Sequence, residues 1–214
     1  MFCKSGKKVV IGIDEAGRGS LGGPVVACAV MFKSKNKIKK EIAPKIKNPK
    51  FLKDSKKLSP KRREEIFEIL RRSPEVEWGI GRVSERVIDK INIFQATKLA
   101  MKRAVINLKS KIKNQKSKID FLLIDGNFGI DLDIPQKSII KGDEKIFLIK
   151  LASIIAKVTR DRAMLRYHKK YPQYRFDKHK GYGTKLHFQM LKKYGPCKIH
   201  RKTFRPIKGI FNFQ

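Results

Sequence analysis

Val9-Val10-Ile11-Gly12-Ile13, followed at once by Asp14 and Glu15, is the stretch that decides the fold. Five apolar or small residues rich in β-branched side chains are typical of a buried strand, and we expect this strand at the centre of a sheet. Four glycines and Pro24 then indicate a turn, and residues 25–32 form a second apolar run. Strand, turn and strand in succession predict an antiparallel neighbour.

The rest of the chain alternates between strand and helix patterns. Further strands are predicted at residues 76–83, 121–124 and 138–140. Helices are predicted at residues 60–72, 93–108, 144–168 and 184–194, with a short helix capped by Ser84 before the second of these. The clearest helix start is Ser59 followed by Pro60, an N-cap and first-turn pair. Lysine-rich residues 33–53 and 109–118 are expected to form surface loops. Together these patterns favour a single α/β domain with a mixed sheet.

Charge is the strongest compositional signal, because 52 Lys and Arg residues oppose 19 Asp and Glu residues and give a net charge of +33. Such a surface favours a polyanionic partner, either nucleic acid or an anionic membrane, although a lysine-rich surface without a partner is the alternative. The longest apolar run, residues 25–32, is too short to cross a bilayer. With no signal peptide and no metal-type spacing among Cys3, Cys28 and Cys197, we expect a cytoplasmic protein.

Acidic residues are scarce, yet three acidic sites follow predicted strands: Asp14 with Glu15, Asp125, and Asp143. Strand ends of α/β sheets are where ligand sites are usually built. Two like charges 4 Å apart repel by roughly 4 kcal/mol at an effective dielectric of 20, so a hard cation such as magnesium or manganese is the natural partner. Asp125 before Gly126 also suits a turn, and Asp143 also suits the N-cap of the next helix.

Several stretches, in order along the chain, resemble motifs of the type 2 ribonuclease H family, ribonuclease HII. They are Ile11-Gly12-Ile13-Asp14-Glu15-Ala16-Gly17-Arg18-Gly19 continued by Leu21-Gly22-Gly23-Pro24-Val25-Val26, then Asp54-Ser55-Lys56-Lys57-Leu58-Ser59, Leu123-Ile124-Asp125-Gly126-Asn127, Lys141-Gly142-Asp143, Ala152-Ser153-Ile154-Ile155-Ala156-Lys157-Val158-Thr159-Arg160-Asp161-Arg162, and His179-Lys180-Gly181-Tyr182-Gly183-Thr184. The resemblance covers about residues 8–206. The Gly17-Arg18-Gly19 turn, and a first strand close to the start of the chain, favour ribonuclease HII over ribonuclease HIII.

The resemblance implies a ribonuclease H-like fold: a mixed β-sheet flanked by helices, with a catalytic core at about residues 8–170 and a helical substrate-binding segment at about residues 171–214. It implies that Asp14, Glu15, Asp125 and Asp143 hold one or two Mn²⁺ or Mg²⁺ ions. The expected enzyme is a monomer that hydrolyses the RNA strand of RNA–DNA hybrids and cuts 5′ of ribonucleotides embedded in duplex DNA. Its expected products carry a 3′-hydroxyl and a 5′-phosphate.

For the substrate, the resemblance points to the Gly17-Arg18-Gly19 turn, whose backbone can approach a ribose closely and offer both N–H and C=O groups to its 2′-hydroxyl. Ser153 and Lys157, four residues apart on a predicted helix, share a face that could hold a phosphate, with a solvated helix face as the alternative. Tyr182 between two glycines suits packing on a sugar or base, and an ordinary buried loop tyrosine is the alternative. The three histidines His179, His187 and His200 receive no role.

Two other functions remain open at this point. Another nuclease of the same broad fold would share the acids but not the Gly17-Arg18-Gly19 turn together with Tyr182. A non-enzymatic basic nucleic-acid-binding protein would explain the charge of +33. It would have no reason to place acids at strand ends.

Overall fold

The structure is a computed structural model of the chain and describes residues 8–33, 46, 58–112 and 118–210. Most of the lysine-rich stretch 33–53, residues 54–57 of the motif before the first helix, and residues 113–117 of the second lysine-rich stretch lie outside the described residues. The expectation that these stretches form surface loops therefore stays a prediction.

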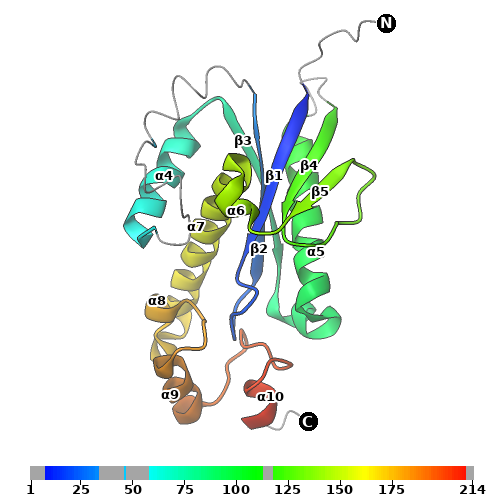
Figure 1. The fold of residues 1–214 in the computed structure, drawn as a ribbon. Helices are drawn as coiled ribbons and strands as arrows, with labels where there is room; N and C mark the ends of the chain where they lie inside the picture. The colour runs from blue at the N-terminus through cyan, green and yellow to red at the C-terminus, as the bar shows by residue number, and fades with distance from the viewer. Residues whose placement is uncertain (1–7, 34–45, 47–57, 113–117, 211–214) are drawn as a thin grey trace, which may run out of the picture.

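A mixed five-stranded sheet lies at the centre of the molecule, in the order β3-β2-β1-β4-β5 (Figure 1). Strand β1 (Val9–Ala16) pairs antiparallel with β2 (Val25–Phe32) and parallel with β4 (Ile119–Asp125). Strand β3 (Val76–Val83) extends the antiparallel side and β5 (Gln136–Ile139) extends the parallel side. The α/β class, the mixed sheet and the central position of the first strand are confirmed. Strand β1 continues through the two acids that were expected to follow it.

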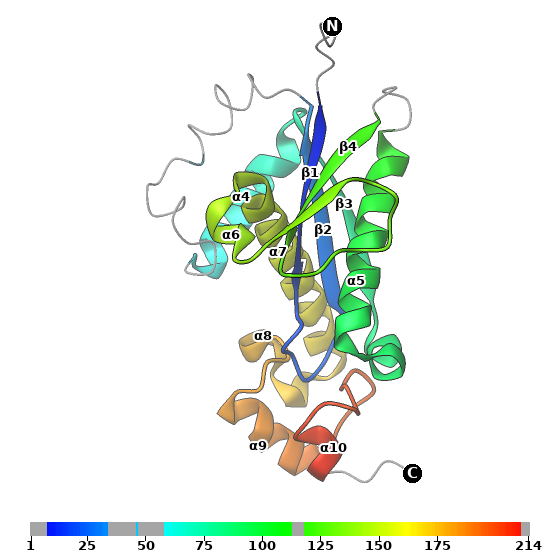
Figure 2. The same cartoon turned by 45° about the vertical axis from the view of Figure 1, so that its right-hand side comes forward.

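Helices cover both faces of this sheet (Figures 1 and 2). Helix α5 (Glu85–Lys111) packs on one face, and α7 (Phe147–Lys170) with α4 (Pro60–Arg72) packs on the other. Because successive side chains of a strand point to opposite faces, β1 contributes to both cores: Ile11 and Ile13 join the α5 side, and Ala16 joins the α7 side.

The predicted N-terminal cap is confirmed for α4 and only in its position for α5. The Ser59 hydroxyl accepts from the Arg62 N–H at 3.2 Å, and Pro60 occupies the first turn. Ser84 is at the N-cap position of α5, but its side chain makes no capping hydrogen bond. The two helices predicted on either side of residue 92 are joined into α5 through a kink at Asn92, where φ is 64°.

The helix predicted for residues 144–168 was wrong at its start. A separate short helix, α6 (Gly142–Lys145), comes first, and Ile146 in extended conformation separates it from α7. Lys141 in left-handed conformation turns the chain into α6, so Asp143 lies within the first turn of that short helix. Asp143 is therefore not the N-cap of the long helix, which was the alternative explanation for this acid.

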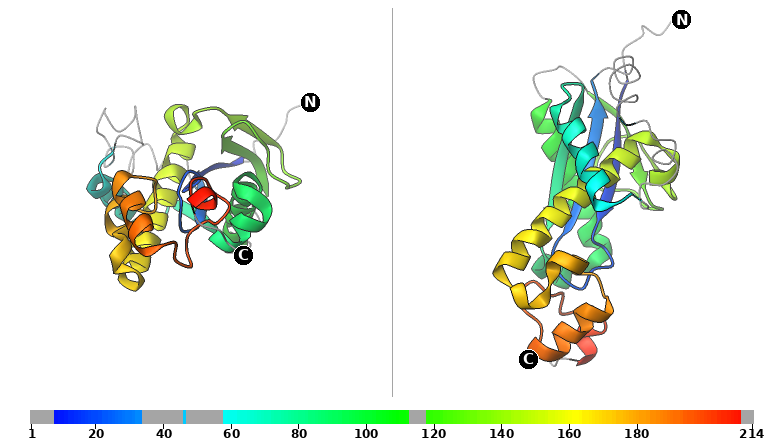
Figure 3. Two further views of the ribbon diagram at one scale, coloured as in Figure 1. Left: turned by 90° about the horizontal axis from the view of Figure 1, so that it is seen from below. Right: turned by 90° about the vertical axis from the view of Figure 1, so that its left-hand side faces the viewer.

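The C-terminal segment packs against the end of α7 and the turn between β1 and β2 (Figure 3). Its elements are η3 (Pro172–Tyr174), α8 (Phe176–His179), α9 (Lys185–Tyr194) and α10 (Ile207–Ile210). Only α9 was predicted. Isolated bridges join Ser20 to Tyr182 and Gly22 to His200, and so tie the turn to this segment. In the part of the chain that the structure describes, every helix is too short or too polar to span a bilayer.

Candidate active site

The four predicted acids come from neighbouring element ends. Asp14 and Glu15 lie near the end of β1, and Asp125 ends β4, the adjacent parallel strand in which Ile124 is in register with Ile13. Asp143 lies in α6, which follows β5 on the other side of β4. The Gly142 N–H donates to Asp125 Oδ1 at 2.6 Å, and this contact brings the start of α6 against the end of β4.

Burial and mutual repulsion raise the pKa values of two of these carboxyl groups, Asp14 and Glu15. Asp14 is 4% exposed, and its pKa is raised well above the ordinary value by burial first and then by the charges of Glu15 and Asp125. Hydrogen bonds from Ser153 and from the Glu15 N–H, the latter at 2.6 Å, oppose that shift. Burial, with a smaller contribution from Asp125, raises the pKa of Glu15 to about 7 although Arg18 lies 3.5 Å away and acts in the opposite direction.

These features fit a divalent cation. The Oε2 atom of Glu15 is buried and has no hydrogen-bond partner in the described residues. All the donor atoms are carboxylate oxygens, which favour hard ions, and a cation among them would relieve the repulsion that raises their pKa values. Within residues 8–33, 46, 58–112 and 118–210, however, no three acidic, histidine or cysteine side chains are already grouped as a metal site.

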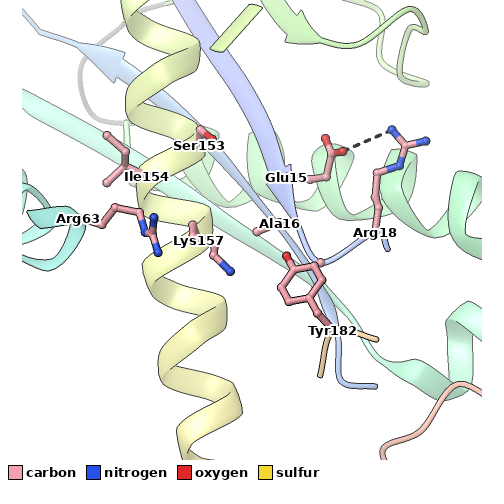
Figure 4. Close-up of a pocket in the computed structure, with 9 residues that line it drawn as sticks. Glu15, Ala16, Arg18, Arg63, Ser153, Ile154, Lys157 and Tyr182 are labelled. Atoms are coloured by element: carbon pink, nitrogen blue, oxygen red, sulfur yellow. Dashed lines mark hydrogen bonds and ion pairs between the residues drawn. The ribbon is translucent and has the colours of Figure 1, made fainter. Parts of the chain in front are cut away.

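A pocket of about 320 Å³ opens beside the end of β1. It is lined by Glu15, Ala16, Gly17, Arg18, Arg63, Ser153, Ile154, Lys157 and Tyr182 (Figure 4). Five of the six residues predicted to bind substrate line it, and the sixth, Gly19, does not. Glu15 and Arg18 lie on one side of the pocket, and Ser153, Lys157 and Arg63 lie on the other.

The α7 side of the pocket carries the groups that suit an anion. Ser153 and Lys157 are half-buried and both line the pocket, so they do not form a freely solvated helix face. Lys157 Nζ lies 3.0 Å from Asp161 Oδ1 and 4.8 Å from the centre of the Tyr182 ring. Tyr182 itself is half-buried, with its ring accessible from the pocket.

The turn after β1 depends on glycine at its first position. Gly17 has φ of 99°, and a Cβ there would lie 2.1 Å from Nε of Arg160, so neither the backbone nor the space admits a side chain. Gly19 is exposed, and nothing lies within 4 Å of where its Cβ would be. Arg18 between them is 44% exposed, with its guanidinium 5.8 Å from the Phe128 ring centre.

Sequence reasoning missed three arginines near the pocket. Arg63 lines it from α4, and Arg160 and Arg201 are fully buried behind the turn. Arg160 belongs to a motif that carried the family resemblance, which was the available signal for its importance. Nothing in the local pattern around Arg201 indicated that it would be buried.

Comparisons with known proteins establish the family of the chain. The family model described as ribonuclease HII matches residues 11–207. The chain belongs to the ribonuclease HII family. It is 47% identical over 212 residues to the ribonuclease HII of Endomicrobium trichonymphae, covering 99% of this chain and 92% of that one. It is 49% identical to the ribonuclease HII of Chlamydia muridarum, covering 96% of this chain and 86% of that one. As a ribonuclease HII it is a ribonuclease H endonuclease, so the non-enzymatic alternative is excluded.

Solved structures show the same fold. The Archaeoglobus fulgidus ribonuclease HII, solved in complex with PCNA, matches with a TM-score of 0.69 at 25% identity and covers 92% of this chain and 95% of that one. The Pyrococcus horikoshii ribonuclease H2 matches with a TM-score of 0.69 at 26% identity, covering 94% and 96%. A ribonuclease HIII solved with Mn²⁺ matches with a TM-score of 0.71 at 18% identity, covering 95% and 69%, and supports the fold alone. The predicted ribonuclease H-like fold is confirmed.

Proposed function

We propose that this enzyme hydrolyses the RNA strand of RNA–DNA hybrids and cuts 5′ of ribonucleotides embedded in duplex DNA, leaving a 3′-hydroxyl and a 5′-phosphate. The observation that carries the proposal is the pocket, which brings together the Glu15 carboxylate, the basic groups of Arg63 and Lys157, and the turn at Gly17 and Arg18. Phosphodiester cleavage needs the carboxylate and the basic groups, and selection of ribose needs a group that senses the 2′-hydroxyl.

Asp14, Glu15, Asp125 and Asp143 would hold one or two Mg²⁺ or Mn²⁺ ions. When bound, such ions supply positive charge where the attacking and leaving oxygens of the phosphodiester become negative. The contribution of the chain is to hold these carboxylates in position. Asp14 is fixed by Ser153 and by the Glu15 N–H, and Asp125 by the Gly142 N–H at 2.6 Å.

The α7 side of the pocket would bind the phosphate next to the scissile bond. Lys157 and Arg63 offer positive charge, and the Ser153 hydroxyl can donate a hydrogen bond to a phosphate oxygen. Lys157 is already held by Asp161 at 3.0 Å, so little side-chain freedom remains to be lost when the phosphate binds.

Ribose would be sensed by the Gly17-Arg18-Gly19 turn, and the following sugar would pack on the Tyr182 ring. The exposure of Arg18 and Gly19 and the half-buried position of Tyr182 on the pocket support both roles. We also propose that residues 171–214, which carry Tyr182, form the substrate-binding segment beside a catalytic core at residues 8–170. We further propose that the enzyme acts as a monomer.

Asp125→Asn tests the metal assignment, because it keeps the shape of the side chain and removes its charge. We expect kcat/KM to fall at least about 100-fold, or about 2.7 kcal/mol of transition-state stabilisation, on a duplex with one ribonucleotide, with an unchanged melting temperature. Asp131→Asn is the matched control, since the Asp131 side chain is 90% exposed and forms a surface ion pair with Lys102. Near wild-type rates of Asp125→Asn in saturating magnesium or manganese would remove Asp125 from the site.

A further inference from the structure

The turn between β1 and β2 is held from inside the protein by Arg201. This side chain is 0% exposed. Its Nη2 donates to the carbonyl of Gly17 at 2.7 Å and to that of Gly23 at 2.9 Å. Its Nη1 donates to the carbonyl of Arg18 at 2.8 Å, and its Nε donates to the carbonyl of Gly23 at 3.1 Å. One guanidinium therefore fixes the carbonyl groups of two of the three residues in the Gly17-Arg18-Gly19 turn.

The charge of Arg201 has no carboxylate ion pair in the described chain within 4 Å. Burial, and after it the neighbouring charge of Arg160, lower its pKa to about 9. A buried charge is costly unless hydrogen bonds compensate it, and here the compensation comes from turn carbonyls. Where stability alone is at stake, apolar groups usually serve as well as a buried charge. The arrangement is therefore better explained by what it does to the turn.

The carbonyl contacts determine where the N–H groups of the turn point. In a planar trans peptide, the C=O and the N–H of the next residue point in opposite directions. Since Arg201 holds the carbonyls of Gly17 and Arg18, the N–H groups of Arg18 and Gly19 point away from the buried guanidinium. Both residues are exposed, so these N–H groups are directed to the side from which a substrate would approach.

We propose that Arg201 is a positioning residue that sets the preference of the enzyme for a ribonucleotide over a deoxyribonucleotide by holding the Gly17-Arg18-Gly19 turn. The inference rests on the proposed function of that turn. Arg201 touches no substrate in this proposal, and it acts only through the backbone groups that it orients.

The segment that carries Arg201 is anchored at both ends. The Arg201 N–H donates to the Leu21 carbonyl at 2.8 Å. Just beyond it, Asp89 of α5 accepts hydrogen bonds from the N–H groups of Lys202 and Thr203, each at 3.0 Å, and from the Thr203 hydroxyl at 2.7 Å. Figure 1 shows the turn between β1 and β2 reaching toward this red and orange part of the chain. Asp89, which is half-buried, thus offers a second position from which the segment that holds the guanidinium can be disturbed.

Arg201→Lys is the first test, because lysine keeps the charge but cannot make the same forked set of contacts. Binding is measured by fluorescence anisotropy in a metal chelator, with two duplexes of one sequence, one all-DNA and one with a single ribonucleotide. We expect the wild type to bind the ribonucleotide duplex roughly 3- to 10-fold more tightly, the range of one or two hydrogen bonds. In Arg201→Lys the ratio of the two Kd values should fall toward 1, with the Kd for the all-DNA duplex within about twofold of wild type, because the phosphate contacts remain.

Asp89→Ala is the second test, since Asp89 is only half-buried and the substitution leaves both apolar cores unchanged, and we expect a smaller fall of the same ratio. Val105→Ala, in the α5 core and remote from the turn, is the control for lost stability and should keep the wild-type ratio. If Arg201→Lys does not fold, Asp89→Ala decides the question.

Two results would overturn the proposal: Arg201→Lys and Asp89→Ala retaining the wild-type ratio, or Val105→Ala lowering it as much as they do. A cleavage assay of the wild type distinguishes a failure of this inference from a failure of the proposed function. A wild type that cuts the ribonucleotide duplex while Arg201→Lys keeps the Kd ratio refutes only the role of Arg201. A wild type that cuts neither a ribonucleotide duplex nor a hybrid in magnesium or manganese refutes the proposed function itself.

Discussion

Two buried histidines in the C-terminal segment predict a steep loss of stability at acidic pH. His187 is 0% and His200 is 2% exposed. Burial lowers the pKa of His187 to about 3 and that of His200 to about 4, and the neighbouring His179 adds to both shifts. The Cys197 N–H donates to His200 Nδ1 at 2.8 Å, so the neutral ring carries its proton on Nε2. That Nε2 lies 3.0 Å from His187 Nε2, and His187 Nδ1 lies 3.0 Å from the Tyr182 carbonyl.

These hydrogen bonds form a directed chain from Cys197 through His200 and His187 to the Tyr182 carbonyl. A proton added to His187 would turn its accepting Nε2 into a donor that faces the His200 N–H. A proton added to His200 would turn Nδ1 into a donor that faces the Cys197 N–H, with the Cys197 carbonyl, 3.3 Å away, as the remaining acceptor. Phe176 packs against both rings, and the stacked His179 ring, 4.2 Å from His187, brings another titratable group to the same cluster. The folded cluster therefore requires neutral histidines.

The sign and size of the effect follow from linkage. A histidine in the unfolded chain has a pKa of about 6.5, so below that pH the unfolded state binds protons that the folded state excludes. The stability contributed by each neutral histidine is complete above about pH 6.5 and is lost as the pH falls toward its folded pKa, by about 1.4 kcal/mol per pH unit. Between pH 6.5 and 4.5 the pair should lose about 4 to 5 kcal/mol, a large part of the stability of an ordinary domain.

The raised pKa of Glu15, about 7, acts in the opposite direction between about pH 7 and 4.5, so the test is a difference between two proteins. In His200→Gln the amide can still donate to His187 but does not titrate. Urea unfolding followed by the fluorescence of Trp78, the single tryptophan, gives the free energy of unfolding at each pH. We expect the variant to be less stable at pH 7.5 but to lose stability less steeply between pH 6 and 4.5, by about 1.4 kcal/mol per pH unit. Parallel curves for the two proteins would refute the reasoning.

Two further predictions concern the substrate. Tyr182→Ala should lower kcat/KM on a single-ribonucleotide duplex by roughly 5- to 150-fold, the range of one lost stacking contact, with a smaller loss on a continuous RNA–DNA hybrid. Tyr182→Phe, which keeps the ring, should stay near wild type, and equal losses on both substrates or a lowered melting temperature would indicate a packing role instead. For the charge, the slope of log affinity against log salt should be only about −4 to −8, because only basic groups facing the duplex release counterions. A slope near −20 in an anisotropy titration would show that the remaining lysines also bind nucleic acid.

Strands and helix starts were predictable where the signal is local. The bounds of β2 and β3 match the predicted ranges 25–32 and 76–83, and Ser59 with Pro60 marks the start of α4, because strand patterning and capping depend on neighbouring residues. The break between α6 and α7 was not predictable, since it is associated with the contact between Gly142 and Asp125, which are 17 residues apart. A continuous apolar period ran through Ile146, and no local residue signalled the interruption.

The candidate site also has residues that local sequence patterns predict and residues that they do not. Acids at strand ends could be recognised because each follows an apolar run, and parallel pairing of β1 with β4 then brings two of those ends together. The contacts of Arg160 and Arg201 could not be predicted from the residue pattern, because their hydrogen-bond partners are backbone carbonyls, although Arg160 does lie in a motif that carries the family resemblance. Arg160 donates to the carbonyls of Pro24 and Gly22, each at 3.0 Å, from more than a hundred residues away. Backbone acceptors have no side-chain pattern, so a sequence gives no sign of which arginine will find them.

The positive charge of this protein therefore acts in two physically different ways. Lysines on the surface attract any polyanion, and because they meet phosphates, which DNA and RNA share, they change affinity for both alike. Arg160 and Arg201 are buried, and both donate hydrogen bonds to the protein's own carbonyls at the turn. On our proposal the charge of Arg201 acts on the nucleic acid indirectly, through the orientation of the uncharged N–H groups of Arg18 and Gly19. Salt screens the first kind of interaction strongly and buried contacts weakly. Raising the salt concentration should then weaken binding to both duplexes while leaving the ratio of their Kd values nearly constant, whereas disturbing the turn should change the ratio at any salt concentration.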